Sequence, residues 1–279
     1  MKDGISLRAA LDDAALRLAP SQTARRDAEL LLMHAISCDR AFLLTHPEMK
    51  LALEQAATYD SWLSRRAQNE PVQYIVGEQE FFGLKFRVTP DVLIPRLETE
   101  HLVEAALARV NHNAPLRIAD IGTGSGAIAV ALAHALPNAR VAATDISQAA
   151  LDVARGNAEL HGAGARIEFI ESDLLGAVKE ESFDLIVSNP PYVADSEQPE
   201  AQVRDFEPRL ALFAGPDGLD VYRRLIPPAR EALKPGGWLL MEIGHGQREA
   251  LWELLRGWDE ASFIGDLQGI PRVACARRV

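Results

Sequence analysis

The segment Asn189-Pro190-Pro191-Tyr192 contains the residues of this chain best suited to chemistry. Its two prolines fix φ and remove backbone N–H donors, so the backbone presents carbonyl oxygens in a rigid arrangement. Asn189 adds a side-chain amide and Tyr192 an aromatic face. We therefore expect a planar NH2 group to donate one hydrogen to the Asn189 side-chain oxygen and the other to the Pro190 carbonyl, while it stacks on Tyr192.

Two acceptors of this kind would make a poor nucleophile reactive. The lone pair of an amide or aniline-type nitrogen is delocalised, and acceptors aimed at its hydrogens push electron density back onto nitrogen and turn the lone pair toward an electrophile. A strong general base is not needed before the transfer. The alternative is that the segment is only a proline-rich turn that ends a strand.

A glycine-rich loop, Asp-Ile-Gly-Thr-Gly-Ser-Gly over residues 120–126, lies between an expected strand and an expected helix. Glycines allow a tight turn and let the backbone approach a ligand. We expect this loop to bind a cofactor. Its spacing differs from the GxGxxG of dinucleotide folds, and it has no Lys or Arg for a phosphate, so a plain strand–helix turn is the alternative. The five residues expected to bind are Gly122, Thr123, Gly124, Ser125 and Gly126.

Acidic residues follow the next two expected strands. Asp145 is placed to accept both hydroxyl hydrogens of a ribose, although it could instead cap the helix that follows Ser147. Asp173 could accept the exocyclic amine of an adenine while Leu174 packs on the ring. Loops at the carboxyl ends of parallel strands are where ligands bind in such sheets.

Alternating strands and helices from residue 117 onward position these loops. This alternation predicts an α/β fold with a mostly parallel sheet covered on both faces. Strands are expected at 117–121, 140–144, 167–170, 183–188 and 238–243, with a pair of strands within 263–277; helices are expected at 98–109, 127–136, 149–160, 219–233 and 247–257.

The first part of the chain has a helical pattern instead. Helices are expected from Leu7, with Ser6 as N-cap and Pro20 at its end, over residues 24–35, and over Glu48–Arg66. A β-hairpin around Gly83 follows. These patterns predict a helical bundle at 1–77, a linking hairpin at 78–92 and a second domain at 93–279.

The four loops together resemble those of the seven-stranded S-adenosyl-methionine-dependent methyltransferases, which have a Rossmann-like sheet. The resemblance implies that Gly122 to Gly126 line the methionine and ribose, that Asp145 holds the ribose hydroxyls, and that Asp173 and Leu174 frame the adenine. It also implies that Asn189 contacts both cofactor and substrate. The electrophile is then the sulfonium methyl group, and the product is S-adenosyl-homocysteine.

Further segments are similar to one branch, the PrmC/HemK family, over nearly the whole chain. They are Glu70–Gly77, Glu80–Leu84, Leu93–Glu100, Glu207-Pro208, Ala211-Leu212, Gly215, Asp217–Leu219, Met241–Gly244 and Gln247. The family methylates the side-chain amide nitrogen of the glutamine in the Gly-Gly-Gln motif of peptide-chain release factors. The resemblance implies that residues 189–192 bind this glutamine and that the helical bundle helps to dock the release factor. Leu97 departs from the usual proline.

Three other functions compete with this one. Sister enzymes methylate a glutamine of a ribosomal protein, but Glu98-Thr99-Glu100 favours the release-factor branch. DNA adenine methyltransferases share the tetrapeptide, but a net charge of −11 and the lack of a recognisable target-recognition domain disfavour a duplex substrate. A non-catalytic interaction protein is disfavoured because both sets of motifs are intact.

The composition is that of an ordinary globular protein, with 48% hydrophobic and 25% charged residues. The sequence shows neither an apolar run long enough for a bilayer nor a signal peptide, so we expect a cytoplasmic protein with no membrane partner. The spacing of Cys38 and Cys275 fits neither a disulfide framework nor a metal site, and we expect no metal.

Overall fold

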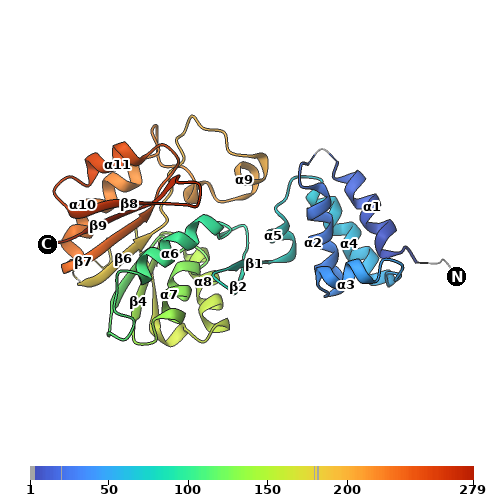
Figure 1. Ribbon diagram of the computed structural model, residues 1–279, viewed down its shortest axis with the longest axis horizontal. Coiled ribbons are helices and arrows are strands. Elements are labelled where there is room, and N and C mark those ends of the chain that lie inside the picture. The colour runs from blue at the N-terminus through green and yellow to red at the C-terminus, as the bar shows by residue number, and fades with distance from the viewer. Residues whose placement is uncertain (1–3, 20, 179, 181) are drawn as a thin grey trace. The chain divides into compact units, whose positions relative to one another are not determined.

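The computed structural model describes residues 4–19, 21–178, 180 and 182–279 (Figure 1). The expected helix end at Pro20 lies outside these residues. The chain divides into two compact units, residues 1–77 with 200–206 and residues 78–199 with 207–279. Within the described ranges, every helix is too short or too polar to cross a membrane.

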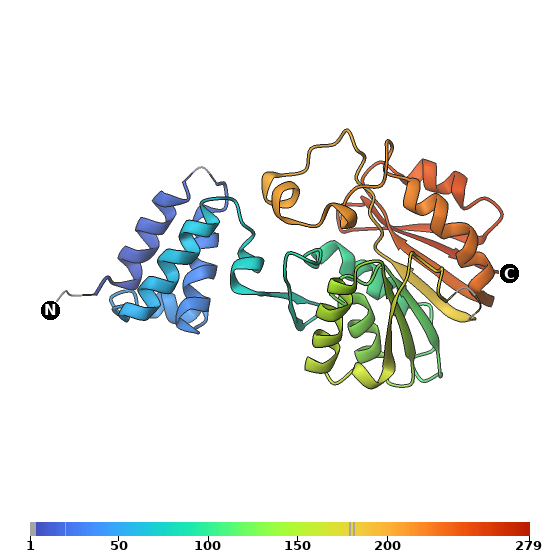
Figure 2. The same cartoon turned by 180° about the vertical axis from the view of Figure 1, so that it is seen from behind.

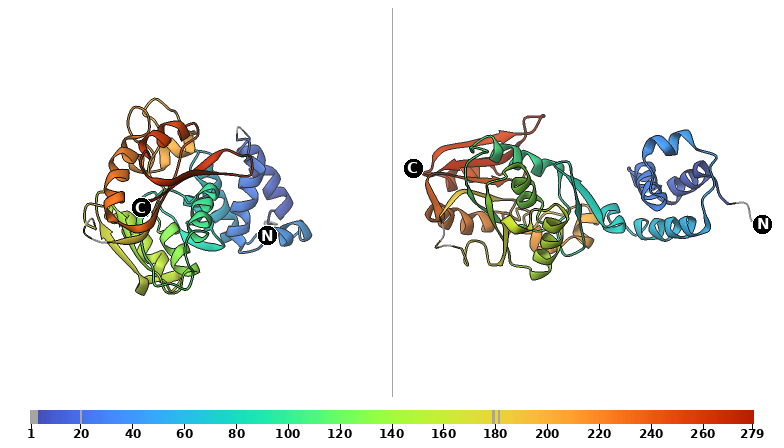
Figure 3. Two further views of the ribbon diagram at one scale, coloured as in Figure 1. Left: turned by 60° about the vertical axis from the view of Figure 1, so that its left-hand side comes forward. Right: turned by 90° about the horizontal axis from the view of Figure 1, so that it is seen from below.

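The first unit is a helical bundle (Figures 1 and 3). Ser6 caps its first helix as expected, since the Ser6 Oγ accepts a hydrogen bond from the Ala9 N–H. Apolar residues at helical spacing form the core, which includes Leu7, Leu31 and Leu63. The helices are α1 (Leu7–Arg17), α2 (Ala24–Ile36), α3 (Arg40–Thr45), α4 (Leu53–Arg66) and α5 (Val72–Val76), and α9 (Ala201–Phe206) also belongs to this unit.

One expectation for the bundle is wrong, and one helix was not predicted. The helix expected over Glu48–Arg66 begins later, because the chain before α4 is extended: the Leu51 N–H donates to the Ile5 carbonyl at 3.0 Å, and the Leu7 N–H donates to the Met49 carbonyl at 2.9 Å. Helix α3 was not expected at all. It has six residues, and the Asp39 side chain caps it by accepting from the Phe42 N–H.

The expected hairpin around Gly83 is confirmed. Strands β1 (Glu78–Phe81) and β2 (Leu84–Arg87) are antiparallel and joined by a two-residue turn. Both turn residues have positive φ, 51° at Phe82 and 72° at Gly83, which matches the twist of the flanking strands. Phe81 and Phe86 are buried in the core of the second unit.

The second unit contains a seven-stranded sheet of order β5-β4-β3-β6-β7-β9-β8, which confirms the expected fold class. Strands β5, β4, β3, β6 and β7 are parallel, and β9 and β8 add an antiparallel edge. The strands are β3 (Arg117–Ile121), β4 (Arg140–Asp145), β5 (Ile167–Glu171), β6 (Phe183–Ser188), β7 (Leu233–Glu242), β8 (Asp259–Gly265) and β9 (Pro271–Arg277).

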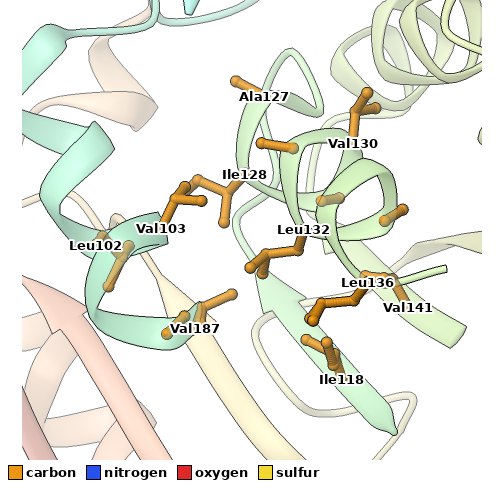
Figure 4. Close-up of a cluster of buried hydrophobic side chains, with 14 of the residues drawn as sticks. Leu102, Val103, Ile118, Ala127, Ile128, Val130, Leu132, Leu136, Val141 and Val187 are labelled. Atoms are coloured by element: carbon orange, nitrogen blue, oxygen red, sulfur yellow. The ribbon is translucent and has the colours of Figure 1, made fainter. Parts of the chain in front are cut away.

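Helices cover both faces of this sheet (Figures 1 and 2). On one face, Val103 and Leu132 from two helices meet Val187 of β6 (Figure 4). On the other, Tyr222 and Leu251 pack on Ile186 of the same strand. The helices are α6 (Glu100–Leu107), α7 (Ala127–Ala135) and α8 (Gln148–Leu160) on the first face, and α10 (Asp220–Ala232) and α11 (Arg248–Leu254) on the second; 3-10 turns lie at η1 (Leu97–Thr99), η2 (Gly164–Arg166) and η3 (Arg209–Ala211).

Strand β7 is longer than expected. It begins at Leu233 rather than Trp238, because Leu233 already pairs with Phe183 across an irregular register before the regular pairing starts at Leu185 and Trp238. Gly236 and Gly237 therefore lie within this strand. The short helix α9 was also not expected.

Asn157 ties three separated segments of the second unit together. Its side chain is fully buried on α8. The oxygen accepts from the Arg87 N–H at 2.8 Å, and the amide nitrogen donates to the Arg87 carbonyl at 3.0 Å and to the Ser125 carbonyl at 2.8 Å. One side chain therefore joins the hairpin, α8 and the glycine-rich loop.

Replacing Asn157 by Ala should lower the free energy of unfolding by about 2–4 kcal/mol, because it leaves buried backbone groups of Arg87 and Ser125 without partners. Urea unfolding of the purified variant measures this loss. Glu159→Ala, an exposed change on the same helix, is the control and should stay within about 0.5 kcal/mol. Equal stabilities for the two variants would contradict this role.

Candidate functional site

The register of the parallel strands brings the expected loops to one level. Ile121, the last residue of β3, pairs with Thr144 of β4 and with Ser188 of β6. Gly122, Asp145 and Asn189 therefore each directly follow a strand residue at the same level of the sheet. Gly122 is the first glycine of the glycine-rich loop. The strand order also reverses at β3, which is where ligands bind in open parallel sheets.

A cavity of about 370 Å³ lies over this edge. Nine of the residues expected from the sequence to form the site line it: Gly122, Thr123, Gly124, Ser125, Asp145, Asp173, Leu174, Asn189 and Pro191. Three others expected there, Gly126, Pro190 and Tyr192, are not among the lining residues. The cavity is further lined by Arg96 and Thr99 from the chain before α6, and by Arg224 of α10.

The glycine-rich loop is fixed by backbone hydrogen bonds. The N–H groups of Gly122 and Thr123 both donate to the Thr144 carbonyl, at 2.9 and 2.8 Å. Gly124 has a φ of 54°, a region that favours glycine, and nothing lies within 4 Å of where its Cβ would be. A side chain there would extend into open space at the cavity, and glycine leaves that space unoccupied.

Gly126 has a packing role. It is the N-cap of α7, and a Cβ on it would lie 3.0 Å from the Cβ of Ala154 in α8. The third glycine therefore allows two helices to approach each other, while the first two shape the cavity wall.

Asp145 connects the loop to the next helix. Its Oδ2 accepts from the Gly124 N–H and its Oδ1 from the Ser147 N–H, both at 2.9 Å. The N-cap of α8 is Ser147, whose Oγ accepts from the Ala150 N–H. Asp145 is thus not the cap itself, and each of its carboxylate oxygens retains capacity to accept a further hydrogen bond at the cavity wall.

Asp173 and Leu174 follow β5. The Asp173 carboxylate accepts from Arg224 at 2.5 Å, and both side chains are more than half exposed, so the pair itself adds little stability. Leu174 has a φ of 52°, and its carbonyl accepts from the Thr144 hydroxyl at 3.2 Å. That bond holds the backbone of Leu174 beside β4 in an uncommon conformation for a branched residue.

Asn189 is held by a chain of buried polar groups. Its Nδ2 donates to the Thr99 Oγ1 at 3.1 Å, and the Thr99 hydroxyl donates to the Glu242 Oε2 at 2.5 Å. The Tyr192 hydroxyl donates to the other Glu242 oxygen at 3.4 Å. Burial raises the pKa of Glu242 to about 7. Tyr192 thus directs its hydroxyl toward Glu242.

The backbone of Tyr192, the last residue of the tetrapeptide, is anchored by residues distant in sequence. The Gln247 side-chain nitrogen donates to the Tyr192 carbonyl at 2.9 Å, and the Tyr192 N–H donates to the Leu212 carbonyl at 3.2 Å. A Cβ on Gly218 would lie 2.2 Å from the Tyr192 oxygen. The segments near 212, 218 and 247 therefore position the tetrapeptide.

Arg96 is fixed beside the cavity by Glu207. The guanidinium donates to the buried Glu207 carboxylate at 2.5 Å, and the other Glu207 oxygen accepts from the Ile94 N–H at 3.3 Å. Burial raises the pKa of Glu207, and the neighbouring Arg96 opposes that shift. These bonds fix the segment before η1, in which Arg96 lines the cavity.

Sequence reasoning did not assign roles to Thr99, Glu242, Glu207 or Asp120. The first three occur in segments that resemble a family, but their burial and partners depend on tertiary contacts between residues about 90 to 143 positions apart. The described residues contain no cluster of three or more His, Cys, Asp or Glu side chains arranged to hold a metal.

Asp120 lies beneath the loop and is completely buried. Its Oδ2 accepts from the Thr123 hydroxyl at 2.6 Å and from the Ala129 N–H at 3.1 Å, whereas Oδ1 has no hydrogen-bond partner in the part of the chain that the structure describes. Burial raises the pKa of Asp120 to about 7. A protonated carboxyl is therefore stable there at mildly acidic pH.

Comparison with known proteins covers both units. The family model of the PrmC N-terminal domain matches residues 9–77, and that of the methyltransferase small domain matches residues 99–206. A release factor glutamine methyltransferase of Koribacter versatilis is 47% identical over 279 residues, which cover 98% of this chain and 99% of that protein. One from Moorella thermoacetica is 48% identical over 281 residues, with the same coverage of both.

A solved structure shares the fold. The 16S rRNA N2 G1207 methyltransferase of T. thermophilus, in complex with AdoMet and guanosine, matches with a TM-score of 0.55 at 20% identity, over 72% of this chain and 50% of that chain.

Asp120 predicts a dependence of stability on pH. The folded protein binds this proton more tightly than the unfolded chain, whose carboxyl has a pKa of 3.8. The stabilisation is therefore complete below that value and is lost as the pH rises through about 7. Between pH 5 and 8, the unfolding free energy should fall by about 2–3 kcal/mol more in the wild type than in Asp120→Asn, which cannot ionise. Urea titrations at both pH values test this, and parallel losses in the two proteins would contradict it.

Proposed function

Since the chain belongs to the release factor glutamine methyltransferase family, we propose that it transfers a methyl group from S-adenosyl-methionine to the side-chain amide nitrogen of a glutamine in peptide-chain release factors. The glutamine is that of the Gly-Gly-Gln motif. One observation carries the proposal: Asn189 stands at the cavity with its NH2 group bound to Thr99, which leaves its oxygen to accept from a substrate NH2.

The cavity suits S-adenosyl-methionine, which supplies an electrophilic methyl group on a sulfonium. Because Gly122 and Gly124 have no side chains, the backbone can approach a ligand there. The loop also has no Lys or Arg that could bind a phosphate. In this proposal, Gly122 to Gly126 border the methionine and ribose, although Gly126 acts through helix packing. Asp145 accepts from the ribose hydroxyls with its remaining lone pairs.

The adenine is proposed to bind at the far end of the same cavity wall. Asp173 accepts from the exocyclic amine, and Leu174 packs on the ring. The Asp173 carboxylate already binds Arg224, and that contact orients it without using all of its lone pairs.

The reacting amide is proposed to sit against residues 189–192. Asn189 Oδ1 accepts one amide hydrogen and the Pro190 carbonyl the other, while Pro191 keeps this backbone rigid and Tyr192 supplies an aromatic face. Pro190 and Tyr192 do not line the cavity, so the substrate would reach them from outside it. Two acceptors aimed at the hydrogens return electron density to nitrogen. The proton leaves after methyl transfer.

The helical bundle, residues up to Gly77, is proposed to help dock the release factor. The two matching family models support a separate unit here, since one of them covers residues 9–77 alone. A substrate used in translation termination would place the enzyme in the cytoplasm.

The substrate class is tested with labelled S-adenosyl-methionine and three acceptors: a release factor, a ribosomal-protein mixture and duplex DNA. Label should enter the release factor and be absent from a matched release factor whose motif glutamine is changed to alanine. Label in a ribosomal protein of the mixture alone would assign the enzyme to the sister branch, which methylates a ribosomal protein. Label in DNA but not in the release factor would overturn the proposal.

Two variants separate transfer from cofactor binding. Asn189→Ala removes an acceptor for the reacting NH2, so kcat should fall by about 10²–10³ while part of the cofactor affinity remains. Asp145→Ala removes the proposed ribose acceptor and the support of Gly124, so the Kd for S-adenosyl-methionine should rise about 10- to 100-fold. Calorimetry and single-turnover assays measure both. Near-normal turnover of the first variant, or unchanged affinity of the second, would refute the corresponding role.

A further inference from the structure

Thr99 and Glu242 form a buried polar relay behind Asn189. They come from η1 and from the end of β7, whereas Asn189 follows β6. Thr99 is 4% exposed and Glu242 3% exposed. The two hydrogen bonds that connect the three side chains are 2.5 and 3.1 Å long. Three segments that are distant in sequence therefore converge on the amide proposed to bind substrate.

The chemistry of these groups sets the direction of the hydrogen bonds. The Thr99 hydroxyl donates its single hydrogen to Glu242 Oε2, and the ionised carboxylate, which predominates above the Glu242 pKa of about 7, can only accept it. The Thr99 oxygen then has only lone pairs to offer Asn189, and the Asn189 group facing it has to be the NH2. No hydrogen bond to Asn189 Oδ1 is present among the described residues, so this oxygen is left for the substrate.

The alternative orientation of the amide would be inactive. If the Asn189 amide turned by 180°, its NH2 would face the substrate NH2, and two donors cannot bond to each other. The two orientations of an asparagine amide differ in free energy only through the groups that its oxygen and its NH2 contact. Here the Thr99 oxygen favours the orientation in which the NH2 faces it.

Glu242 is itself held in place. Its second carboxylate oxygen accepts from the Tyr192 hydroxyl at 3.4 Å, and its backbone carbonyl accepts from the Tyr222 hydroxyl at 2.8 Å. Burying a carboxylate costs free energy unless its oxygens are hydrogen-bonded. Here both are, by donors that fix the side chain.

We propose that Thr99 is a positioning residue which, through Glu242, sets the Asn189 amide with its oxygen toward the nitrogen to be methylated. The proposal rests on the proposed function for what the orientation achieves. The orientation itself is a property of the free protein and is measurable without substrate.

The matched pair Thr99→Val and Thr99→Ser tests the effect on catalysis. Valine keeps the shape and removes the hydroxyl, whereas serine keeps the hydroxyl and removes a methyl group. In Thr99→Val we expect kcat to fall about 10- to 50-fold, with the Kd for S-adenosyl-methionine within threefold of wild type. Thr99→Ser should return kcat to within about threefold of wild type. A Thr99→Val kcat within twofold of wild type, or equal losses in both variants, would overturn the proposal.

The side-chain amide signal of Asn189 gives a second measurement that needs no methyl transfer. In protein labelled with ¹⁵N-asparagine, the signal is assigned by its absence in Asn189→Ala. Its NH2 should exchange slowly in the wild type and in Thr99→Ser, and faster, with a changed shift, in Thr99→Val. If Thr99→Val does not fold, Thr99→Ala removes the same hydroxyl without added bulk. An Asn189 signal unchanged by loss of the hydroxyl would overturn the positioning role.

The two measurements distinguish the proposal from the proposed function. If the wild type labels no release factor, the proposed function fails, and the amide signal still decides whether Thr99 holds Asn189. If the wild type is active and the amide signal does not respond to the hydroxyl, the positioning role fails alone.

Discussion

The site depends on the parallel pairing of β3 with both of its neighbours. Because Ile121 is level with Thr144 and with Ser188, the chain leaves all three strands at one height, and the residues that follow meet above the sheet. A shift of one residue in either pairing would turn each side chain of a buried strand to the opposite face, where it would not fit the helices packed there, so the core and the site are fixed by the same register. The helices on both faces stabilise that register because they bury the side chains of the paired strands.

The sequence predicted the regular part of this arrangement well. Buried strands followed by amphipathic helices, and glycines at a strand–helix junction, are local patterns, and they located the cavity wall from Gly122 to Asp145. Segments set by distant contacts were not accessible in the same way. The extended stretch near Met49 pairs with the chain before α1, and Leu233 joins β7 only because Phe183 lies beside it. Thr99 and Glu242 lie in segments that resemble the family, but their hydrogen bond joins residues 143 positions apart and could not be predicted from local pattern.

Two buried carboxylates contact residues of the candidate site: Asp120 accepts from Thr123, and Glu242 accepts from Tyr192. Both have raised pKa values caused by burial, yet their surroundings differ. Each Glu242 oxygen accepts a side-chain hydrogen bond, whereas Asp120 places both of its bonds on one oxygen. Glu242 therefore suits a role in fixing direction within a polar chain. Asp120 ties Thr123 to the first turn of α7 and so stiffens the glycine-rich loop from below.

The bridging side chain of Asn157 has a consequence for the order in which the protein is assembled. Its partners lie 70 and 32 residues earlier in the chain, in the hairpin and in the glycine-rich loop. The loop gains these contacts only when a remote hairpin and α8, the third helix of the second unit, have docked on it. Closing a stretch of chain this long costs entropy before the contacts that it brings together are gained. Competence to bind a small molecule is therefore a property of the fully assembled sheet domain, and a nascent chain that ends before α8 lacks the side chain that completes it.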